Sequence, residues 1–241
     1  MKIDVLLQPS AIAAFAHSES IGAVCVVFDV LRATSTMLAG LECGVSEFFP
    51  VATVEAALSM RAQRPSALLG GERGGERIEG FDLGNSPFEY QDKSGRSIIT
   101  TTTNGTVALR ACSGASAVLV GAVVNLTALA GAVEAMQPER LVVVCAGTGE
   151  GLALEDVWAA GALISYFKEA TWSDAAQTAV AVRGAWSDAG AALRQSENGR
   201  SLLKNGRLAD VEWCASMDRL QTVGCMEAGV VRKWSREKLN S

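Results

Sequence analysis

The sequence has very few of the residues that build transition-metal and disulfide sites. A single histidine, His17, occurs among 241 residues, and the six cysteines include no Cys-x-x-Cys pair. A structural zinc site is therefore not expected, because zinc takes a tetrahedral set of Cys and His ligands. A chain of this length is also not a disulfide-stapled scaffold, so the thiols are expected to be reduced and mostly buried. Any bound metal is expected to be a hard cation held by carboxylates.

Long apolar runs and an excess of basic residues are also missing. No stretch approaches the ~18–20 consecutive apolar residues that a membrane span needs. An acidic residue, Asp4, falls where the apolar part of a signal peptide would begin. The formal net charge is −5, and Lys and Arg form no basic stripe. We therefore expect a soluble, cytoplasmic protein with neither a nucleic acid nor a membrane as partner.

Hydrophobic residues make up 49% of the chain and charged residues 20%, which is enough apolar material for a full core. Short runs rich in Val, Ile, Leu and Cys alternate with Ala- and Leu-rich segments of helical spacing. This alternation is typical of a parallel sheet covered by helices on both faces. The expected strands are 4–7, 23–29, 47–51, 66–69, 97–102, 117–120 and 141–145. The expected helices between them are 34–43, 54–63, 104–112 and 125–136.

The last third of the chain has a different pattern. Helical spacing dominates after about residue 154, with helices expected over 155–168 and 174–186 and shorter pieces through 217. The apolar run 222–231 predicts either one more strand or a hairpin about Glu227-Ala228-Gly229. Because no Pro-rich or Ser/Gly-rich linker divides the chain, we expect a single α/β domain over 1–241. Its sheet is expected to be mostly parallel, and its C-terminal third rich in helix.

Polar residues collect at three corners where an expected strand leads into an expected helix. The corners contain Asp29, Arg32, Thr34 and Ser35; Thr103, Asn104, Gly105 and Thr106; and Glu155 and Asp156. In open α/β sheets ligands bind outside the carboxyl ends of the strands. The unpaired N–H groups of helix N-termini also attract anions. An anionic group with several oxygens, such as phosphate, is therefore expected at these corners.

Carboxylates lie at the same strand ends and on the loop that follows the fourth expected strand. They are Asp29, Glu72, Asp82, Glu155 and Asp156. Carboxylate oxygens are the ligands that Mg²⁺ prefers. A phosphate-binding corner beside a Mg²⁺ site indicates phosphoryl chemistry.

Each corner also has a purely structural interpretation. Thr and Ser before a helix commonly cap it, and a lone acid after a strand, such as Asp29, is a common turn residue. Glu155 and Asp156 favour the dipole of a helix without any metal. The coincidence of three polar corners beside one crevice favours a functional site.

The segment 70–87, GGERGGERIEGFDLGNSP, is unlike the rest of the chain. It contains six glycines and six charged residues and has no helical or alternating period. An irregular segment of this length is usually a functional loop or a disordered linker. Its interleaved apolar residues Ile78, Phe81 and Leu83 are expected to anchor it, so we expect an ordered functional loop.

Four segments carry a resemblance that covers most of the chain: FDVLRATST, GGERGGERIEGFDLGNSP with the following FEY, TTTNGT, and CAGTGEGLALED. A weaker match continues through SENGRSLLKNGRLADVEWCASMD. In this order and spacing they resemble the 2-phosphosulfolactate phosphatases, enzymes of the coenzyme M pathway. The resemblance implies a Mg²⁺-dependent phosphatase with a three-layer α/β/α fold, distinct from the haloacid dehalogenase phosphatases.

The resemblance also implies the site residues, whose individual roles are our hypothesis. Asp29 and Arg32 are expected to be catalytic. The expected metal ligands are Asp29, Glu72, Asp82, Glu155 and Asp156. The expected substrate-binding residues are Thr34, Ser35, Arg73, Asn85, Ser86, Thr103, Asn104, Gly105 and Thr106. The expected substrate is a small anionic phosphorylated hydroxy acid, 2-phospho-3-sulfolactate, with Arg73 on its second anionic group.

Two other functions remain open from the sequence. The chain could be a non-catalytic module that senses a phosphorylated or sulfonated metabolite. A haloacid-dehalogenase phosphatase with Asp29 as nucleophile would need a second acid two residues later, where Leu31 stands. The sequence also leaves a homodimer open and does not fix the oligomeric state.

Overall fold

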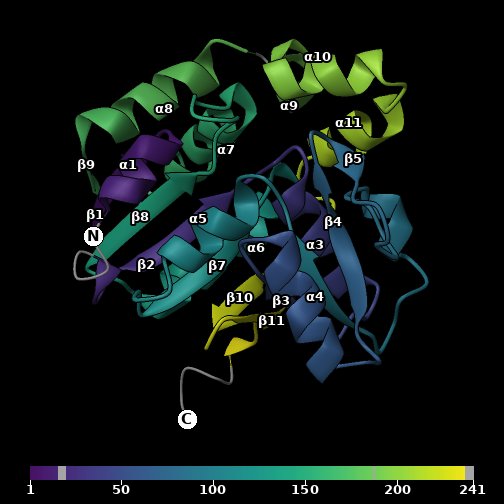
Figure 1. Cartoon of the computed structure of the whole chain (residues 1–241). Coiled ribbons are helices and arrows are strands. Elements are labelled where there is room, and N and C mark those ends of the chain that lie inside the picture. The colour runs from purple at the N-terminus through teal and green to yellow at the C-terminus, as the bar shows by residue number, and fades with distance from the viewer. Residues whose placement is uncertain (16–19, 187, 237–241) are drawn as a thin grey trace.

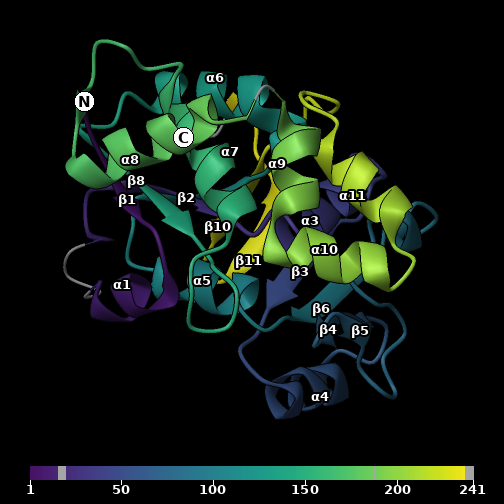
Figure 2. The same cartoon turned by 90° about the horizontal axis from the view of Figure 1, so that it is seen from above.

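The computed structural model describes residues 1–15, 20–186 and 188–236. These residues form three layers, with one sheet between two groups of helices (Figure 1, Figure 2). The strands are β1 (Lys2–Leu6), β2 (Val24–Phe28), β3 (Glu47–Pro50), β4 (Leu68–Arg73), β5 (Glu76–Arg77), β6 (Ser97–Thr101), β7 (Ala117–Gly121), β8 (Arg140–Cys145), β9 (Thr171–Trp172), β10 (Gly224–Glu227) and β11 (Val230–Lys233). The predicted α/β class with a mostly parallel sheet is confirmed.

Two parallel groups of strands make up the sheet, whose order is β5-β4-β6-β3-β11-β10-β7-β2-β8-β1-β9. Strands β4, β6 and β3 pair in parallel, as do β7, β2, β8, β1 and β9. Between them the β10–β11 hairpin makes antiparallel pairs with β7 and β3. Three successive antiparallel pairings (β3 with β11, β11 with β10, and β10 with β7) separate the two parallel groups. The strands of one group therefore run antiparallel to those of the other.

The 222–231 run forms the hairpin rather than a single strand. Its two-residue turn consists of Ala228 and Gly229, which both have positive φ, at 48° and 77°. Positive φ at both turn residues is typical of two-residue hairpin turns, because the twist of such a turn matches the twist of the flanking strands. The hairpin therefore joins the two parallel groups into one sheet.

Helices cover both faces of the sheet. They are α1 (Pro9–Ala14), α3 (Ala33–Glu42), α4 (Val54–Gln63), α5 (Gly105–Ala111), α6 (Leu126–Met136), α7 (Leu154–Ile164), α8 (Asp174–Gly184), α9 (Ala189–Gln195), α10 (Glu197–Lys204) and α11 (Leu208–Ala215), with short 3-10 turns at Pro87–Tyr90 and Val123–Asn125. Figure 2 shows α1, α4 and α5 on one face and α3, α6, α7 and α8 on the other. Helices α9, α10 and α11 gather beyond one edge (Figure 1). Every helix in the described ranges is too short or too polar to span a membrane.

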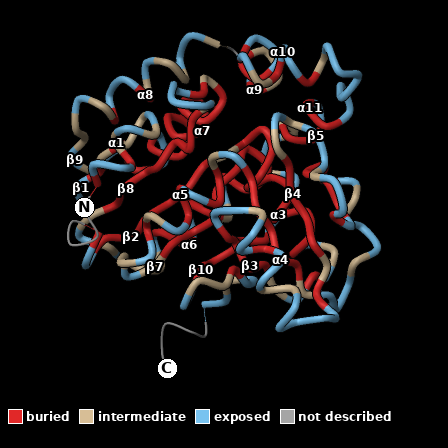
Figure 3. Tube along the Cα trace, viewed as in Figure 1, coloured by how far each residue is buried: buried red, intermediate tan, exposed pale blue. Residues whose placement is uncertain are grey.

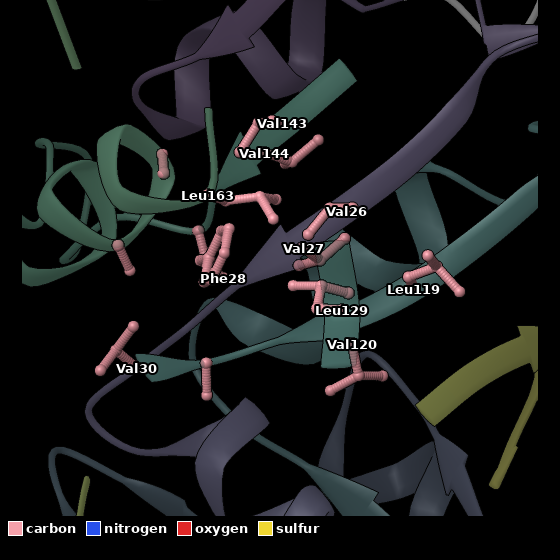
Figure 4. Packing of buried hydrophobic residues seen from close by; sticks show 14 of the residues in the cluster. Val26, Val27, Phe28, Val30, Leu119, Val120, Leu129, Val143, Val144 and Leu163 are labelled. Carbon is pink, nitrogen blue, oxygen red and sulfur yellow. The ribbon is translucent and has the colours of Figure 1, made fainter. Parts of the chain in front are cut away.

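The core lies around the central strands β2, β7 and β8. All five residues of β2 are buried, as the near-continuous apolar run predicts for a strand covered on both faces. Val26, Val27 and Phe28 pack with residues of the neighbouring strands and with Leu129 of α6 and Leu163 of α7 (Figure 4). Figure 3 shows the central strands buried and the outer helices exposed on one side. This core holds the carboxyl ends of the strands in fixed positions.

The 70–87 segment is ordered, as predicted, although it is not wholly irregular. Strand β4 continues to Arg73 and turns back into β5 through Gly74 and Gly75, whose φ values are 62° and 85°. Phe81 and Leu83 are each only 6% exposed. They therefore anchor the returning part of the segment, as the sequence predicts.

Candidate active site

One pocket of about 330 Å³ opens between the strand-end loops and the C-terminal helices. We call its inner part the strand-end floor, which follows β2, β4, β6 and β8. It comprises Asp29, Arg32, Glu72, Asn85, Thr103, Asn104 and the turn from Gly147 to Gly149. We call its outer part the helical wall, which comes from α10 and the start of α11. The wall comprises Glu197, Asn198, Ser201, Asn205 and Arg207.

The carboxyl ends of both parallel groups converge on the floor, even though the groups run in opposite senses. Asn104, after β6, donates from Nδ2 to the backbone oxygens of Ala146 and Gly149, each at 3.0 Å, in the loop that follows β8. Glu72, near the end of β4, accepts from the backbone N–H of Thr103 at 2.8 Å. These hydrogen bonds fix the loops to one another.

Asp29 lies just after β2, where the floor is tightest. Its Oδ1 accepts from the backbone N–H of Ala33 at 3.1 Å. A Cβ on Gly105 would stand 2.5 Å from Asp29 Oδ2, so glycine is what lets α5 come this close. Part of Asp29 opens to the pocket, but enclosure on its other sides raises its pKa to about 7, with further contributions from the charges of Glu72 and Glu155. The backbone N–H groups of Ala33 and Gly105 oppose this rise.

Arg32 is 5% exposed and is held from two directions. Its Nη1 donates to Asp210 of α11 at 2.5 Å, and its Nη2 donates to the backbone oxygen of Gly75 at 2.7 Å. Ser86 donates to the other oxygen of Asp210 at 2.8 Å. A guanidinium has five N–H donors, so Arg32 retains donors for a ligand. Ser86 thus acts on the site through Asp210 and is not among the described residues that line the pocket.

The hydroxyl groups of the first and second corners donate back to the backbone. Thr34 Oγ1 donates to the backbone oxygen of Asp29 at 2.9 Å, and Ser35 Oγ donates to that of Val30 at 2.8 Å. Thr106 Oγ1 donates to Thr102 O at 3.2 Å. All three side chains are buried, and none belongs to the described pocket lining. Each hydroxyl thus holds the backbone of its own corner. None acts as the helix cap of the structural interpretation, because the N-cap residues of α3 and α5 are Arg32 and Asn104, and neither makes a side-chain cap.

Glu72 links the β4–β5 turn to the second corner, which contains Thr103. Its Oε2 accepts from the backbone N–H of Gly75 at 2.8 Å, and its Oε1 accepts from the N–H and the hydroxyl of Thr103 at 2.8 and 3.0 Å. Since Gly75 also accepts from Arg32, the turn connects Arg32 and Glu72 across the floor. The predicted placement of Glu72 beside Asp29 in one pocket is therefore observed.

Arg73 and Asp82 also lie outside the described pocket lining. Arg73 donates to the backbone oxygen of Glu72 at 2.7 Å and to Thr101 Oγ1 at 2.9 Å, which ties β4 to β6. Asp82 accepts from the backbone N–H of Leu69 at 2.8 Å and from Arg61 at 2.9 Å. Burial pushes the pKa of Asp82 upward, but these two partners outweigh burial and hold it below its usual value. Both side chains are thus occupied in holding the sheet edge.

Glu155 and Asp156, at the start of α7, lie behind the floor. Asp156 accepts from the backbone N–H groups of Val30 at 2.8 Å and Gly147 at 3.1 Å, so it joins the loops after β2 and β8. Asn198 of the wall donates to Glu155 Oε1 at 2.7 Å. Within the described part of the chain, Glu155 Oε2 is buried and has no hydrogen-bond partner. Burial raises the pKa of both carboxyls above their usual values.

The carboxylates at and behind the floor are the type of ligand that a hard cation prefers, but they are few. Among the described residues, no group of three or more His, Cys, Asp or Glu side chains is arranged to hold a metal ion. Asp29 and Glu72 line the pocket, and Glu155 carries the buried oxygen without a partner. Mg²⁺ usually keeps several waters and uses one or two carboxylates together with substrate phosphate oxygens. The residues present fit that mode of binding better than a cage of five carboxylates.

The sequence did not predict the helical wall or two of the residues near it, Asp210 and Arg207. Asp210, the partner of Arg32, is 178 positions away in the chain, and Arg207 lines the mouth of the pocket. Both fall within the segment 196–218, where the resemblance to the family is weaker. Its many polar residues, placed within a segment of helical spacing, were the feature of the sequence that could have indicated a binding surface.

Comparison with known proteins gives one consistent result. A sequence model described as 2-phosphosulpholactate phosphatase matches residues 11–229. A probable 2-phosphosulfolactate phosphatase of Deinococcus radiodurans is 41% identical over 212 residues, which cover 86% of this chain and 88% of the relative. Proteins with the same name from Carboxydothermus hydrogenoformans and Clostridium perfringens are 36% and 34% identical, covering 92% and 96% of both chains. The chain therefore belongs to the 2-phosphosulfolactate phosphatase family.

Proposed function

We propose that this chain is a phosphoric monoester hydrolase that converts 2-phospho-3-sulfolactate and water to 3-sulfolactate and phosphate, and that it requires Mg²⁺. Water attacks phosphorus, the bond from phosphorus to the C2 oxygen breaks, and that oxygen takes up a proton. The observation that carries the proposal is the floor itself. There, Asp29 and the buried, oriented Arg32 face one pocket in a chain of this family.

Arg32 is the proposed contact to the transferring phosphoryl group. Phosphoryl transfer spreads negative charge over the peripheral oxygens of the transition state, so catalysis depends mainly on positioned positive charge. Asp210 and Gly75 fix the guanidinium and leave its remaining N–H groups for those oxygens. Asn85, Thr103 and Asn104 supply neutral polar groups around the same space.

The charge balance of the pocket supports a bound cation. Four acids line it, Asp29, Glu72, Glu76 and Glu197, against two arginines, Arg32 and Arg207. A phosphate ester that also carries a carboxylate and a sulfonate would meet an acidic surface. Mg²⁺ held by Asp29 and Glu72 would neutralise phosphate charge and lower the pKa of bound water. Asp82 lies outside this proposed ligand set because its carboxylate holds Leu69 and Arg61.

The direct test is phosphate release from 2-phospho-3-sulfolactate by the purified chain. We expect release with Mg²⁺, loss of release with EDTA, and recovery when excess Mg²⁺ is added. If neither Mg²⁺ nor Mn²⁺ supports release, while calorimetry still detects binding of the phosphorylated acid, the chain is a binding module and the proposal is wrong.

We also propose a reducing compartment, the cytoplasm, as the place where the chain works. All six cysteines are free thiols, and five of them are buried in the described structure. Secreted domains that rely on cysteine normally pair it. Labelling of thiols in protein extracted from intact cells tests this, and extensive oxidation of the six thiols would contradict it.

A further inference from the structure

The two arginines in the pocket lining are held in different ways. Arg32 is buried and donates to a carboxylate and a backbone oxygen. Arg207 precedes α11 at the pocket mouth, and 43% of its side chain is exposed. Its partner there is Glu76 of β5, at 3.8 Å, whose side chain is 63% exposed. An exposed ion pair of this length contributes little, so Arg207 can leave Glu76 at small cost.

The substrate of the proposed reaction has more negative charge than Arg32 can balance. Besides the phosphate it carries a carboxylate and a sulfonate, and the charge of Arg32 is already opposed by Asp210. A cation at Asp29 and Glu72 would serve the phosphate end of the molecule. The other end must extend from the floor toward the mouth, where Glu76 and Glu197 repel anions and Arg207 attracts them.

Arg73 does not fill this role. Its guanidinium donates to backbone oxygens of Glu72 and Ala52 and to Thr101 Oγ1, and the residue is outside the described pocket lining. The wall next to Arg207 offers neutral polar side chains instead. Ser201 and Asn205 of the α10 region line the pocket and are exposed to it. A hydroxyl, an amide and a guanidinium together suit an anion with several oxygens.

We propose that Arg207 is the specificity-determining residue that binds the second anionic group of the substrate, its sulfonate or carboxylate. The inference rests on the proposed function for the identity of the substrate. Binding moves the guanidinium from Glu76 to the substrate and exchanges an exposed ion pair for one inside the pocket. Selectivity for a phosphorylated acid over a plain phosphate ester then comes from the helical wall.

The test compares two substrates and two arginines. In R207A, kcat/KM for 2-phospho-3-sulfolactate should fall about 10–100-fold, mostly through KM, because a hydrogen-bonded charge is lost. For 4-nitrophenyl phosphate, which has no second anion, the change should stay within about twofold. R207K should recover part of the loss, since it keeps the charge without the planar fork. R73A is the matched control and should leave the ratio of the two kcat/KM values unchanged. Equal losses on both substrates in R207A, or no loss on either, overturn the inference.

A binding measurement separates this inference from the proposed function. Calorimetry with 3-sulfolactate, which carries sulfonate and carboxylate but no phosphate, should show about tenfold or weaker binding in R207A and unchanged binding in R73A. If the wild-type chain hydrolyses neither ester but shows this pattern, the proposed reaction fails and the role of Arg207 stands. If R207A binds 3-sulfolactate as the wild type does, or the wild type does not bind it, the role of Arg207 fails.

Discussion

The strand-end floor and the helical wall of the pocket are built by different physical means. In the floor, Arg32 and Glu72 are buried, and each is hydrogen-bonded to a segment distant in the sequence. In the wall, Glu197, Ser201, Asn205 and Arg207 are exposed on helices that lie beyond the sheet edge. Fixed charges suit a transition state, because they need no reorganisation during the reaction. Exposed side chains suit recognition, because they can exchange partners when a ligand arrives. The difference supports our proposal that chemistry and selectivity occupy separate parts of this pocket.

Among the variants that keep Asp29, the largest effect should follow from crowding the floor. In G105A the new Cβ would stand 2.5 Å from Asp29 Oδ2 and 2.8 Å from Ala33 Cβ, so the carboxylate or α5 must move. We expect kcat to fall about 100-fold on both phosphate esters, which is what a displacement near 1 Å can cost. G131A is the matched control, because no atom lies within 4 Å of a Cβ there. Activity of G105A close to that of G131A would show that the position of Asp29 is not critical.

A smaller effect should follow from loosening Arg32. D210N keeps one acceptor oxygen for Arg32 and places an N–H donor toward Ser86, whose hydroxyl can accept, but it removes the charge that faces the guanidinium. We expect kcat to fall about tenfold on both substrates, with KM for the sulfonated acid changed far less. The free energy of unfolding should also fall, by about 3 kcal/mol, because a buried arginine loses its counter-charge. E212Q, an exposed neighbour on α11, is the control. A D210N variant that loses stability but keeps the wild-type kcat would limit Asp210 to a structural role.

The pKa of Asp29 predicts how the effect of Mg²⁺ depends on pH. Burial raises this pKa from 3.8 to about 7 in the metal-free chain. Between pH 3.8 and pH 7, Asp29 is therefore protonated in the folded state and ionised in the unfolded state. Asp29 therefore lowers the stability of the metal-free chain as pH rises through that window. A metal ligand must be deprotonated. Added Mg²⁺ should thus raise the melting temperature more at pH 8 than at pH 6, by about 2–4 °C. An equal rise at both pH values would argue against Asp29 as a ligand.

The smallest effects should come from residues that the sequence placed in the site and the structure places at the sheet edge. R73A and D82N should keep kcat and KM within about threefold of the wild type on both substrates. Each should lower the melting temperature, since each removes hydrogen bonds that hold β4 in place. A large loss of turnover in either folded variant would return that residue to the active site.

The helices, strands and strand-to-helix corners could be predicted from local sequence, but the distant residues that each corner contacts could not. The expected helix 54–63 matches α4 residue for residue, and Asp29 does follow β2, because hydrophobic period and turn chemistry are local properties. The pattern could not reveal that the hairpin after residue 222 joins two oppositely directed groups of strands. It also could not tell a serine that bonds to the backbone of its own corner, such as Ser35, from one that faces a ligand.

The contacts of the helical wall also could not be predicted from local sequence. Arg32 meets Asp210 and Glu76 meets Arg207 only because the fold brings together residues more than a hundred positions apart. Arg73 has the same side chain as Arg207 and stands in the most distinctive segment of the sequence. Its actual partners, Thr101 and backbone oxygens, follow from the pairing of β4 with β6. Residue type alone therefore favoured Arg73, which the structure leaves outside the described pocket lining.

The most direct test of the division between floor and wall is the ratio of kcat/KM for 2-phospho-3-sulfolactate to that for 4-nitrophenyl phosphate, measured in D29N and R207A. D29N should lower both values by at least about 10³-fold and leave their ratio near that of the wild type, because Asp29 serves the phosphoryl end that both substrates share. R207A should lower the ratio at least about tenfold while kcat for the aryl ester is retained. A ratio that changes as much in D29N as in R207A, or that changes in neither, would contradict the account.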